Sequence, residues 1–188
     1  MILIKVPTKW INICKKFAED SSNSSKKLWM KDGTPDNKIE TDIFTGKMGE
    51  VAVHLYLKEV GLNINEPDFV IYKGRQKSWD ADLMDEDFNY HCKTQSSNSA
   101  NKYGISWILQ CSSTRKDKLF TTDSDRDIFV GSVLDEEKSE VHIYFLGHWQ
   151  EIRKFGLIEA PRLAYFAESK RSIYFESTLK YPEINRLI

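Results

Sequence analysis

The chain has 188 residues, of which 40% are hydrophobic and 29% charged, proportions that are ordinary for a globular protein. This length predicts one domain, spanning residues 1–188, with a sizeable core. The net charge of −1 excludes a global basic field, although a local basic groove can coexist with an acidic site. No apolar run reaches the ~20 residues of a membrane span. Three sparse cysteines without metal-ligand spacing predict reduced thiols in a cytoplasmic protein.

Two helices are predicted in the first third of the chain. The first covers residues 7–19, where apolar side chains recur every three or four positions. The polar stretch over residues 20–40 predicts a mobile loop. The second helix covers residues 42–60 and ends at Gly61. Its buried side is expected to consist of Val51, Ala52, Leu55 and Tyr56.

Short strands and loops are predicted for the remainder. In chain order these are a strand over 69–72, a hairpin over 78–95, a Ser/Asn loop over 96–102, a strand or buried helical turn over 105–111, and strands over 127–134 and 140–146. The five tryptophans are expected in the core rather than on a base-stacking surface. The segment after residue 149 carries no motif with an assignable role.

The hairpin over residues 78–95 carries the most informative pattern. Two short alternating segments flank an acidic turn, and side chains along a strand point to opposite faces with period two. A turn centred on residues 86–87 places Asp82 opposite His91. One face of the hairpin is then predicted to carry Asp80, Asp82, His91, Lys93 and Gln95. The alternative is that this face is simply the wet side of an antiparallel sheet.

These residue types are those that hydrolysis of a phosphodiester requires. Glu50 lies on the predicted second helix, which could aim it at the polar end of the hairpin. Glu50 and Asp82 would supply oxygen ligands to Mg²⁺, which polarises the phosphate and lowers the pKa of a bound water. Lys93 would orient that water or stabilise the developing charge. We therefore expect the two carboxylates and the amine to converge in one pocket.

Three short motifs follow one another between residues 42 and 95. They read Gly46-x-x-Gly49-Glu50-x-Ala52-Val53-x-x-Tyr56-Leu57-x-x-x-Gly61, then Ala81-Asp82-Leu83, then His91-Cys92-Lys93-Thr94-Gln95. This order resembles the PD-(D/E)XK nuclease superfamily. The resemblance implies an α/β fold with a restriction-endonuclease-like αβββαβ core, a mixed sheet flanked by helices, and metal-dependent cleavage of phosphodiester bonds. By this resemblance Glu50 matches the helical glutamate, Asp82 the strand aspartate and Lys93 the catalytic lysine.

The chain departs from the family pattern at two positions. His91 stands where an acid is expected, and an imidazole suits transition metals better than Mg²⁺. Mn²⁺ is therefore a second candidate metal, His91 a possible ligand, and Asp80 a carboxylate that would compensate from the same face. Ala81 replaces the proline that names the motif. Gln95 shares the face of His91 and Lys93 and is a supporting site residue.

The sequence thus predicts a metal-dependent DNA endonuclease. Four basic residues after the hairpin are expected to make salt-sensitive DNA contacts, namely Lys102, Arg115, Lys116 and Lys118. A homodimer would allow a two-fold enzyme to cut both strands of a duplex. Two alternatives stay open. One is a non-catalytic nucleic-acid-binding protein that retains the fold, which His91 favours, and the other is an RNA-directed nuclease.

Overall fold

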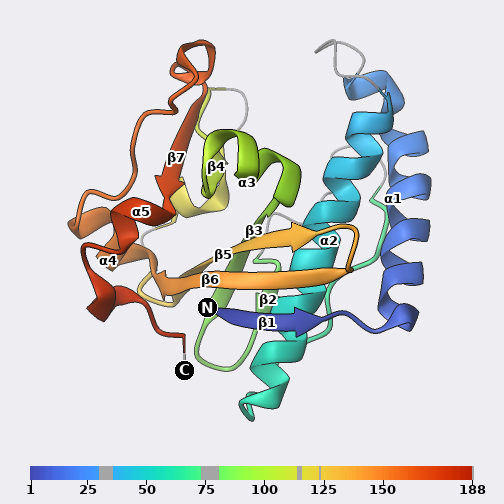
Figure 1. The fold of residues 1–188 in the computed structure, drawn as a ribbon, viewed down its shortest axis with the longest axis horizontal. Coiled ribbons are helices and arrows are strands. Elements are labelled where there is room, and N and C mark those ends of the chain that lie inside the picture. Colours follow the sequence, from blue (N-terminus) through green and yellow to red (C-terminus); the bar gives the residue numbers. More distant parts are fainter. Residues whose placement is uncertain (30–35, 73–80, 114–115, 123, 188) are drawn as a thin grey trace.

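The computed structural model describes residues 1–29, 36–72, 81–113, 116–122 and 124–187 (Figure 1). The helices are α1 (Thr8–Trp29), α2 (Asp36–Glu59), α3 (Ser97–Tyr103), α4 (Trp149–Lys154) and α5 (Phe175–Thr178), and the strands are β1 (Ile2–Lys5), β2 (Leu83–Met84), β3 (Asn89–Ser96), β4 (Ser106–Gln110), β5 (Asp127–Asp135), β6 (Glu140–His148) and β7 (Lys170–Tyr174). Short 3-10 turns cover Lys118–Phe120, Ala164–Phe166 and Pro182–Ile184. Across these described ranges, no helix combines the length and the apolar character that a bilayer span needs.

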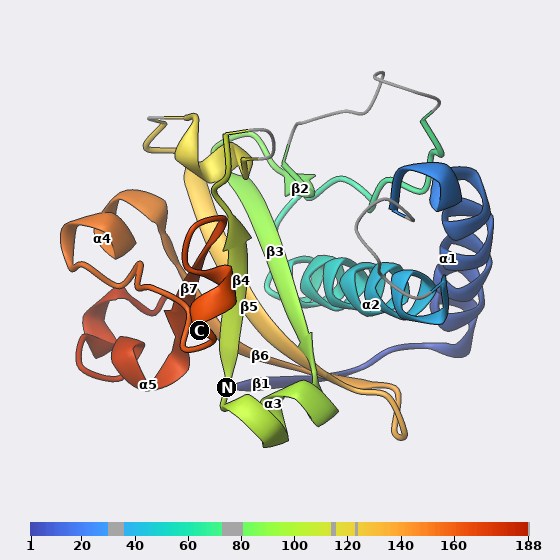
Figure 2. The ribbon, with the colours of Figure 1, turned by 90° about the horizontal axis from the view of Figure 1, so that it is seen from above.

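The fold is α/β, with a mixed five-stranded sheet in the order β1-β6-β5-β3-β2 and a separate β4-β7 ribbon. Strands β3 and β5 are parallel, with Lys93 beside Gly131, and the other pairs are antiparallel. Figure 2 shows α1 and α2 on one side of the sheet, and β4, β7, α4 and α5 on the other. The expected α/β class with a mixed sheet flanked by helices is confirmed.

The edge of β3 is covered over only part of its length. Strand β2 pairs with β3 at just two positions, Leu83 with Tyr90 and Met84 with Asn89. Beyond Tyr90, β3 continues to Ser96 without a strand neighbour on this side in the described part of the chain. A partly open edge leaves backbone donors and acceptors available to other groups.

Helix α2 lies between α1 and the sheet, which explains why apolar residues occupy more than one of its faces. Val51, Ala52 and Val53 are all fully buried, as are most of their apolar neighbours. Three consecutive buried residues cannot share one helix face, so the helix is buried on more than one side. Gly49 permits the closest approach to the sheet, because a Cβ there would lie 1.7 Å from Thr94 Oγ1 and 2.8 Å from Thr94 Cβ. The predicted buried side of this helix is confirmed, apart from a half-buried Leu55.

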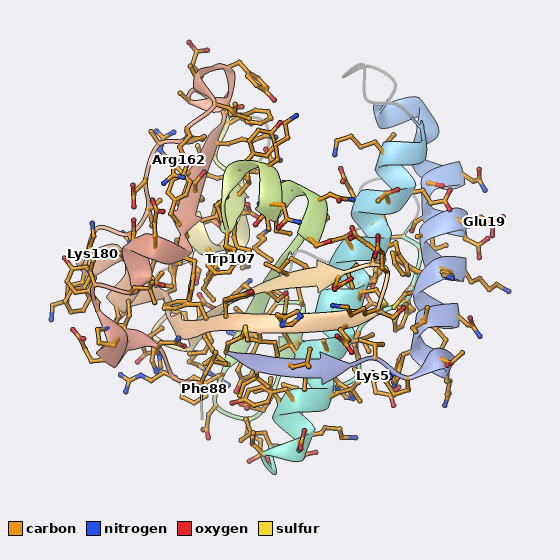
Figure 3. All side chains as sticks on the ribbon, viewed as in Figure 1. Lys5, Glu19, Phe88, Trp107, Arg162 and Lys180 are labelled. Atoms are coloured by element: carbon orange, nitrogen blue, oxygen red, sulfur yellow. The ribbon has the colours of Figure 1, made fainter. Side chains whose placement is uncertain are left out.

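A second core fills the space between the other face of the sheet and the β4-β7 ribbon. Trp107 lies near the middle of the molecule (Figure 3) and is 1% exposed. Its indole Nε1 donates to Ser132 O at 2.9 Å. Trp149 is equally buried, so the expectation that tryptophans are core residues is confirmed for both. Trp29 and Trp79 have side chains outside the described part of the structure.

The expected loop is wrong for residues 20–29 and 36–40, since α1 continues to Trp29 and α2 already begins at Asp36. Residues 30–35 of that prediction lie outside the described part of the chain. The serine-rich stretch carries no apolar period that would have indicated a helix. The structure supplies two supports that the pattern does not reveal. Helix α1 packs along α2, and Ser22 is buried with its hydroxyl donating to Glu19 O at 2.9 Å.

The strand predictions are confirmed where alternation is long and wrong where it is short. Strands β5 and β6 cover the expected segments, and β4 resolves the ambiguity over residues 105–111. Residues 69–72 form no strand, and the expected loop over 96–102 is helix α3. Because α3 buries no side chain, it shows no apolar period, and Ser96 caps it by accepting from Ser99 N. Strand β1 and the elements after Trp149 were not anticipated.

The contact between Gly49 and Thr94 is testable with a matched pair of glycines on α2. We expect Gly49→Ala to lower the free energy of unfolding by about 1–3 kcal/mol, because the added methyl group overpacks a rigid helix–strand contact. At Gly46 an added methyl group would meet no atom within 4 Å, so Gly46→Ala should be neutral or stabilise by up to about 1 kcal/mol through helix propensity. Urea unfolding of both variants measures the difference, and equal values would contradict the close packing.

Candidate functional site

The hairpin has the register that the sequence predicts. Leu83 pairs with Tyr90, Asp85 N donates to Phe88 O at 3.0 Å, and Asp82 N donates to Tyr90 O at 3.1 Å. The turn is therefore centred between residues 86 and 87, and Asp82 lies opposite His91, as expected. Asp80 falls outside the described residues, so its predicted metal-ligand role has no structural counterpart here.

Asp82 and Glu50 lie close enough for their charges to interact. Asp82 Oδ2 accepts a hydrogen bond from Cys92 N at 2.8 Å at the edge of β3, directly before β2 begins at Leu83. Glu50 comes from α2, with a side chain that is 12% exposed. Burial raises the pKa of Glu50 to about 8, the negative charge of Asp82 adds to this shift, and Lys47 opposes it. A buried carboxyl group of α2 is therefore within electrostatic reach of a second carboxyl group at the edge of β3.

Lys47 is the cation next to this acid pair, and the sequence analysis did not single it out. Its Nζ lies 2.5 Å from Glu50 Oε2, and the side chain is 14% exposed. The ammonium also lies 5.1 Å from the ring centre of Phe17 and 5.6 Å from that of Phe69, within cation–π range. The spacing of three residues between Lys47 and Glu50 on a predicted helix was the available signal.

Lys93 does not join the acid pair, which corrects the expected convergence of three groups. Its neighbour Cys92 packs against the core under α2, so the Lys93 side chain leaves from the opposite face of the sheet. Lys93 Nζ lies 2.6 Å from Asp117 Oδ1. Asp117 follows β4 and also accepts from Gln110 N. The predicted catalytic lysine thus links β3 to the second layer.

His91 and Gln95 are likewise held by structural contacts rather than gathered around the acids. His91 is 6% exposed, and its Nε2 lies 3.2 Å from Asp127 Oδ1 at the start of β5. Gln95 Oε1 accepts from Ser106 N at 3.0 Å, and its Nε2 donates to Gly104 O at 3.1 Å. The expectation that both act beside Asp82 is therefore corrected. They face the β4 side because they follow the same alternation as Lys93.

The four predicted DNA-contacting residues have different settings. Lys102, in the last turn of α3, is exposed, with its Nζ 5.1 Å from the ring centre of Tyr103. Lys116 is exposed, and its backbone forms an isolated antiparallel β-bridge with that of Cys111. Lys118 begins a 3-10 turn. Arg115 lies outside the described residues. Of these, Lys102 borders a large cavity.

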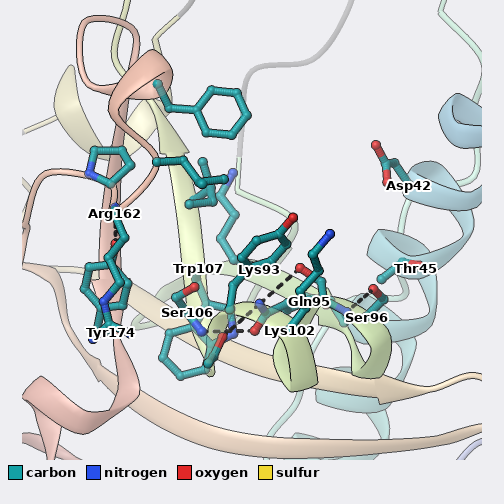
Figure 4. Close-up of a pocket in the computed structure, with 18 of the residues that line it drawn as sticks. Asp42, Thr45, Lys93, Gln95, Ser96, Lys102, Ser106, Trp107, Arg162 and Tyr174 are labelled. Atoms are coloured by element: carbon teal, nitrogen blue, oxygen red, sulfur yellow. Dashed lines mark hydrogen bonds between the residues drawn. The ribbon is translucent and has the colours of Figure 1, made fainter. Parts of the chain in front are cut away.

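A cavity of about 850 Å³ lies beside the open part of β3. Figure 4 shows Asp42 of α2 on one side, Arg162 on the other and Lys93 between them. The part of β3 that lines it runs from Lys93 to Ser96, and neither Glu50 nor Asp82 is among its lining residues. Among the described residues, one carboxylate and four cationic side chains line it. The carboxylate is Asp42, and the cations are Lys38, Lys93, Lys102 and Arg162.

No family model, curated protein or solved structure matches this chain. Among the described residues, no three His, Cys, Asp or Glu side chains gather in a way that could hold a metal ion. Mg²⁺ is commonly bound by only one or two carboxylates, together with waters and substrate phosphates.

The raised pKa of Glu50 predicts a specific dependence of stability on pH. Between the ordinary value of 4.5 and about 8, the folded chain binds more protons at this group than the unfolded chain. The contribution of Glu50 is therefore fully present below pH 4.5 and is lost as the pH rises towards 8. We expect Glu50→Gln to flatten the decline of unfolding free energy across this range by at most about 1.4 kcal/mol per pH unit.

Urea unfolding from pH 4.5 to 9 measures this slope. Glu59→Gln is the matched control, because Glu59 is an exposed glutamate at the end of the same helix. Its slope should follow that of the wild-type chain. Identical slopes for all three proteins would mean that the Glu50 carboxyl is solvated rather than held beside Asp82.

Proposed function

We propose that this chain is a divalent-metal-dependent nuclease that hydrolyses phosphodiester bonds of DNA, with Glu50 and Asp82 as the metal ligands. The observation that carries this proposal is a buried Glu50 carboxyl group that feels the charge of Asp82, whose carboxylate is held at the edge of β3 by Cys92 N. Placing two like charges in a poorly solvated site is costly without a compensating cation. A site of this kind binds a divalent ion favourably because the ion removes that cost.

The donor set of the acid pair fits a hard cation. Both side chains offer carboxylate oxygens, the ligands that Mg²⁺ and Mn²⁺ accept. A divalent ion held there would polarise a phosphate oxygen and make a bound water more acidic. Two carboxylates leave ligand positions for the phosphate and for water. Lys47, 2.5 Å from Glu50, would keep that carboxylate oriented and partly neutralised while the site is empty.

The neighbouring cavity supports nucleic acid as the substrate. It lies along the same strand, where residues 93–96 of β3 form one of its walls, and its described lining holds more positive than negative side chains. Tyr90 O and Cys92 N both point to the open edge, so Thr94 presents its backbone N–H on the same edge two residues further on. Backbone amides and lysines are common partners of phosphate oxygens. In this proposal Lys93 holds the DNA backbone rather than the attacking water.

A non-catalytic nucleic-acid-binding protein is the second candidate, and the contacts of two predicted site residues favour it. Lys93 is paired with Asp117, and His91 with Asp127. Both interactions occupy side chains that the sequence analysis assigned to the catalytic centre. The distinction between the two candidates depends on whether the acid pair binds a metal that is needed for cleavage.

We expect cleavage of labelled DNA oligonucleotides with Mg²⁺ or Mn²⁺ and none with EDTA. Glu50→Gln and Asp82→Asn should each lower the rate by at least about 100-fold, because ligand loss exceeds the 10–100-fold effect of losing an outer partner. Lys47→Gln should fall within that smaller range. Lys93→Gln should raise KM more than it lowers kcat, since Lys93 lies on the other face of the sheet.

Thermal unfolding provides a second readout that needs no activity. Saturating Mn²⁺ should raise the Tm of the wild-type chain, since a ligand at 100 times its Kd stabilises the folded state by about 2.7 kcal/mol. The shift should disappear in Asp82→Asn and persist in the control Glu59→Gln. DNA binding without a metal-dependent Tm shift and without cleavage would favour the non-catalytic protein.

A further inference from the structure

The cavity beside β3 has aromatic residues at its opening as well as cations in its lining. Among the described residues, three aromatic side chains are classed as exposed, namely Tyr72, Tyr103 and Tyr165. Two of these, Tyr103 and Tyr165, line this cavity, and Tyr165 is 73% exposed. Exposed apolar surface concentrated at one hollow marks a binding site more often than scattered residues do.

The volume of the cavity limits what it can hold. About 850 Å³ lies within the range of pockets that enclose drug-sized ligands, which is the size of one or two nucleotides rather than of a duplex. The walls come from α2, β3, α3 and β4 and from the segment around Arg162. Bases inside a duplex stay stacked on one another, whereas bases of a single strand can stack on protein side chains.

Among the four cations of the described lining, Lys102 is the one best placed to bind a phosphate group. Lys38 pairs with Asp42, Lys93 with Asp117 and Arg162 with Glu176. Lys102 makes no ion pair with any other residue that the structure describes, and it lies next to Tyr103. Positive charge beside aromatic side chains is the combination that single-stranded nucleic acids require, because phosphates and unstacked bases are bound at the same time.

We propose that this cavity binds a single-stranded segment of DNA, with one base stacked on Tyr165, another on Tyr103, and a phosphate at Lys102. The inference deepens the proposed nuclease function by naming its substrate class. The strand would enter along the open edge of β3, so that a following phosphate reaches Glu50 and Asp82. Binding in the cavity requires no metal and can therefore be measured apart from cleavage.

Fluorescence anisotropy in EDTA tests the proposal, with a labelled single-stranded 12-mer and the same sequence as a duplex. We expect the single strand to bind at least about tenfold more tightly than the duplex. Tyr165→Ala should weaken binding about tenfold, in line with the loss of one stacked base. Tyr165→Trp should bind as the wild-type chain does, because it keeps a stacking surface.

The salt dependence separates the phosphate contact from a structural effect. Lys102→Ala should lower the slope of log K against log salt by about 0.7, the value for one phosphate contact on a single strand. The control is Lys180→Ala, since Lys180 is exposed on the far side of the β4-β7 ribbon (Figure 3) and should leave the slope unchanged.

The outcomes for this inference and for the proposed function are distinct. Equal affinity for single strand and duplex, or unchanged binding by Tyr165→Ala, would overturn the single-strand site even if metal-dependent cleavage is found. Tight single-strand binding that depends on Tyr165 and Lys102 supports the site even if no cleavage occurs. Circular dichroism of each variant confirms that these exposed substitutions leave the fold intact.

Discussion

The proximity of Glu50 to Asp82 is the interaction on which the site depends. Glu50 is carried to the sheet by α2, and α2 can approach β3 only because Gly49 leaves room for Thr94. Asp82 is fixed from the other side by the Cys92 amide. Burial first, and then the charge of Asp82, raise the pKa of Glu50, and Lys47 opposes only part of that shift. Two neighbouring acids indicate a functional site more strongly than either acid alone, because the folded state has to offset their mutual repulsion.

In the part of the chain that the structure describes, β2 begins at Leu83, directly after Asp82, and pairs with β3 as far as Tyr90. The next edge amide, that of Cys92, donates to the Asp82 side chain rather than to a strand carbonyl. This hydrogen bond holds the Asp82 carboxylate at the edge of β3. The space left along β3 is bounded by α2 on one side and by β4 with its neighbours on the other. The same strand thus positions an acid pair and one wall of a cavity.

The two faces of β3 contact different parts of the protein. Cys92 and Thr94 pack towards α2, where the acid pair lies. His91, Lys93 and Gln95 tie β3 to Asp127, Asp117 and Ser106 respectively. The contacts of Lys93 and Gln95 join the five-stranded sheet to the second layer, and that of His91 ties β3 to β5 within the sheet. Together they explain why the polar face of β3 is not simply exposed to water. Polar residues at a layer boundary need such partners, since an unpaired buried polar group is costly.

The sequence alone determined the local features of this protein. Apolar side chains at helical spacing located the first part of α1, strict alternation located β5 and β6, and the acidic turn set the hairpin register that pairs Leu83 with Tyr90. Glu50 and Asp82 were singled out by the residue types that phosphodiester hydrolysis needs and by the order of the short motifs that carry them. Helix α3 and the second half of α1 escaped prediction, since their polar residues carry no period.

Only the tertiary structure decided which groups meet. Alternation placed Lys93 and Asp82 on one face, but a side chain's partner depends on the layer packed there. Asp117, more than twenty residues away in sequence, holds Lys93, while the edge amide of Cys92 holds the Asp82 carboxylate. Lys47 became part of the site because α1 and residue Phe69 enclose it with aromatic rings. Periodicity describes directions along one element, whereas long-range packing determines the distances between elements.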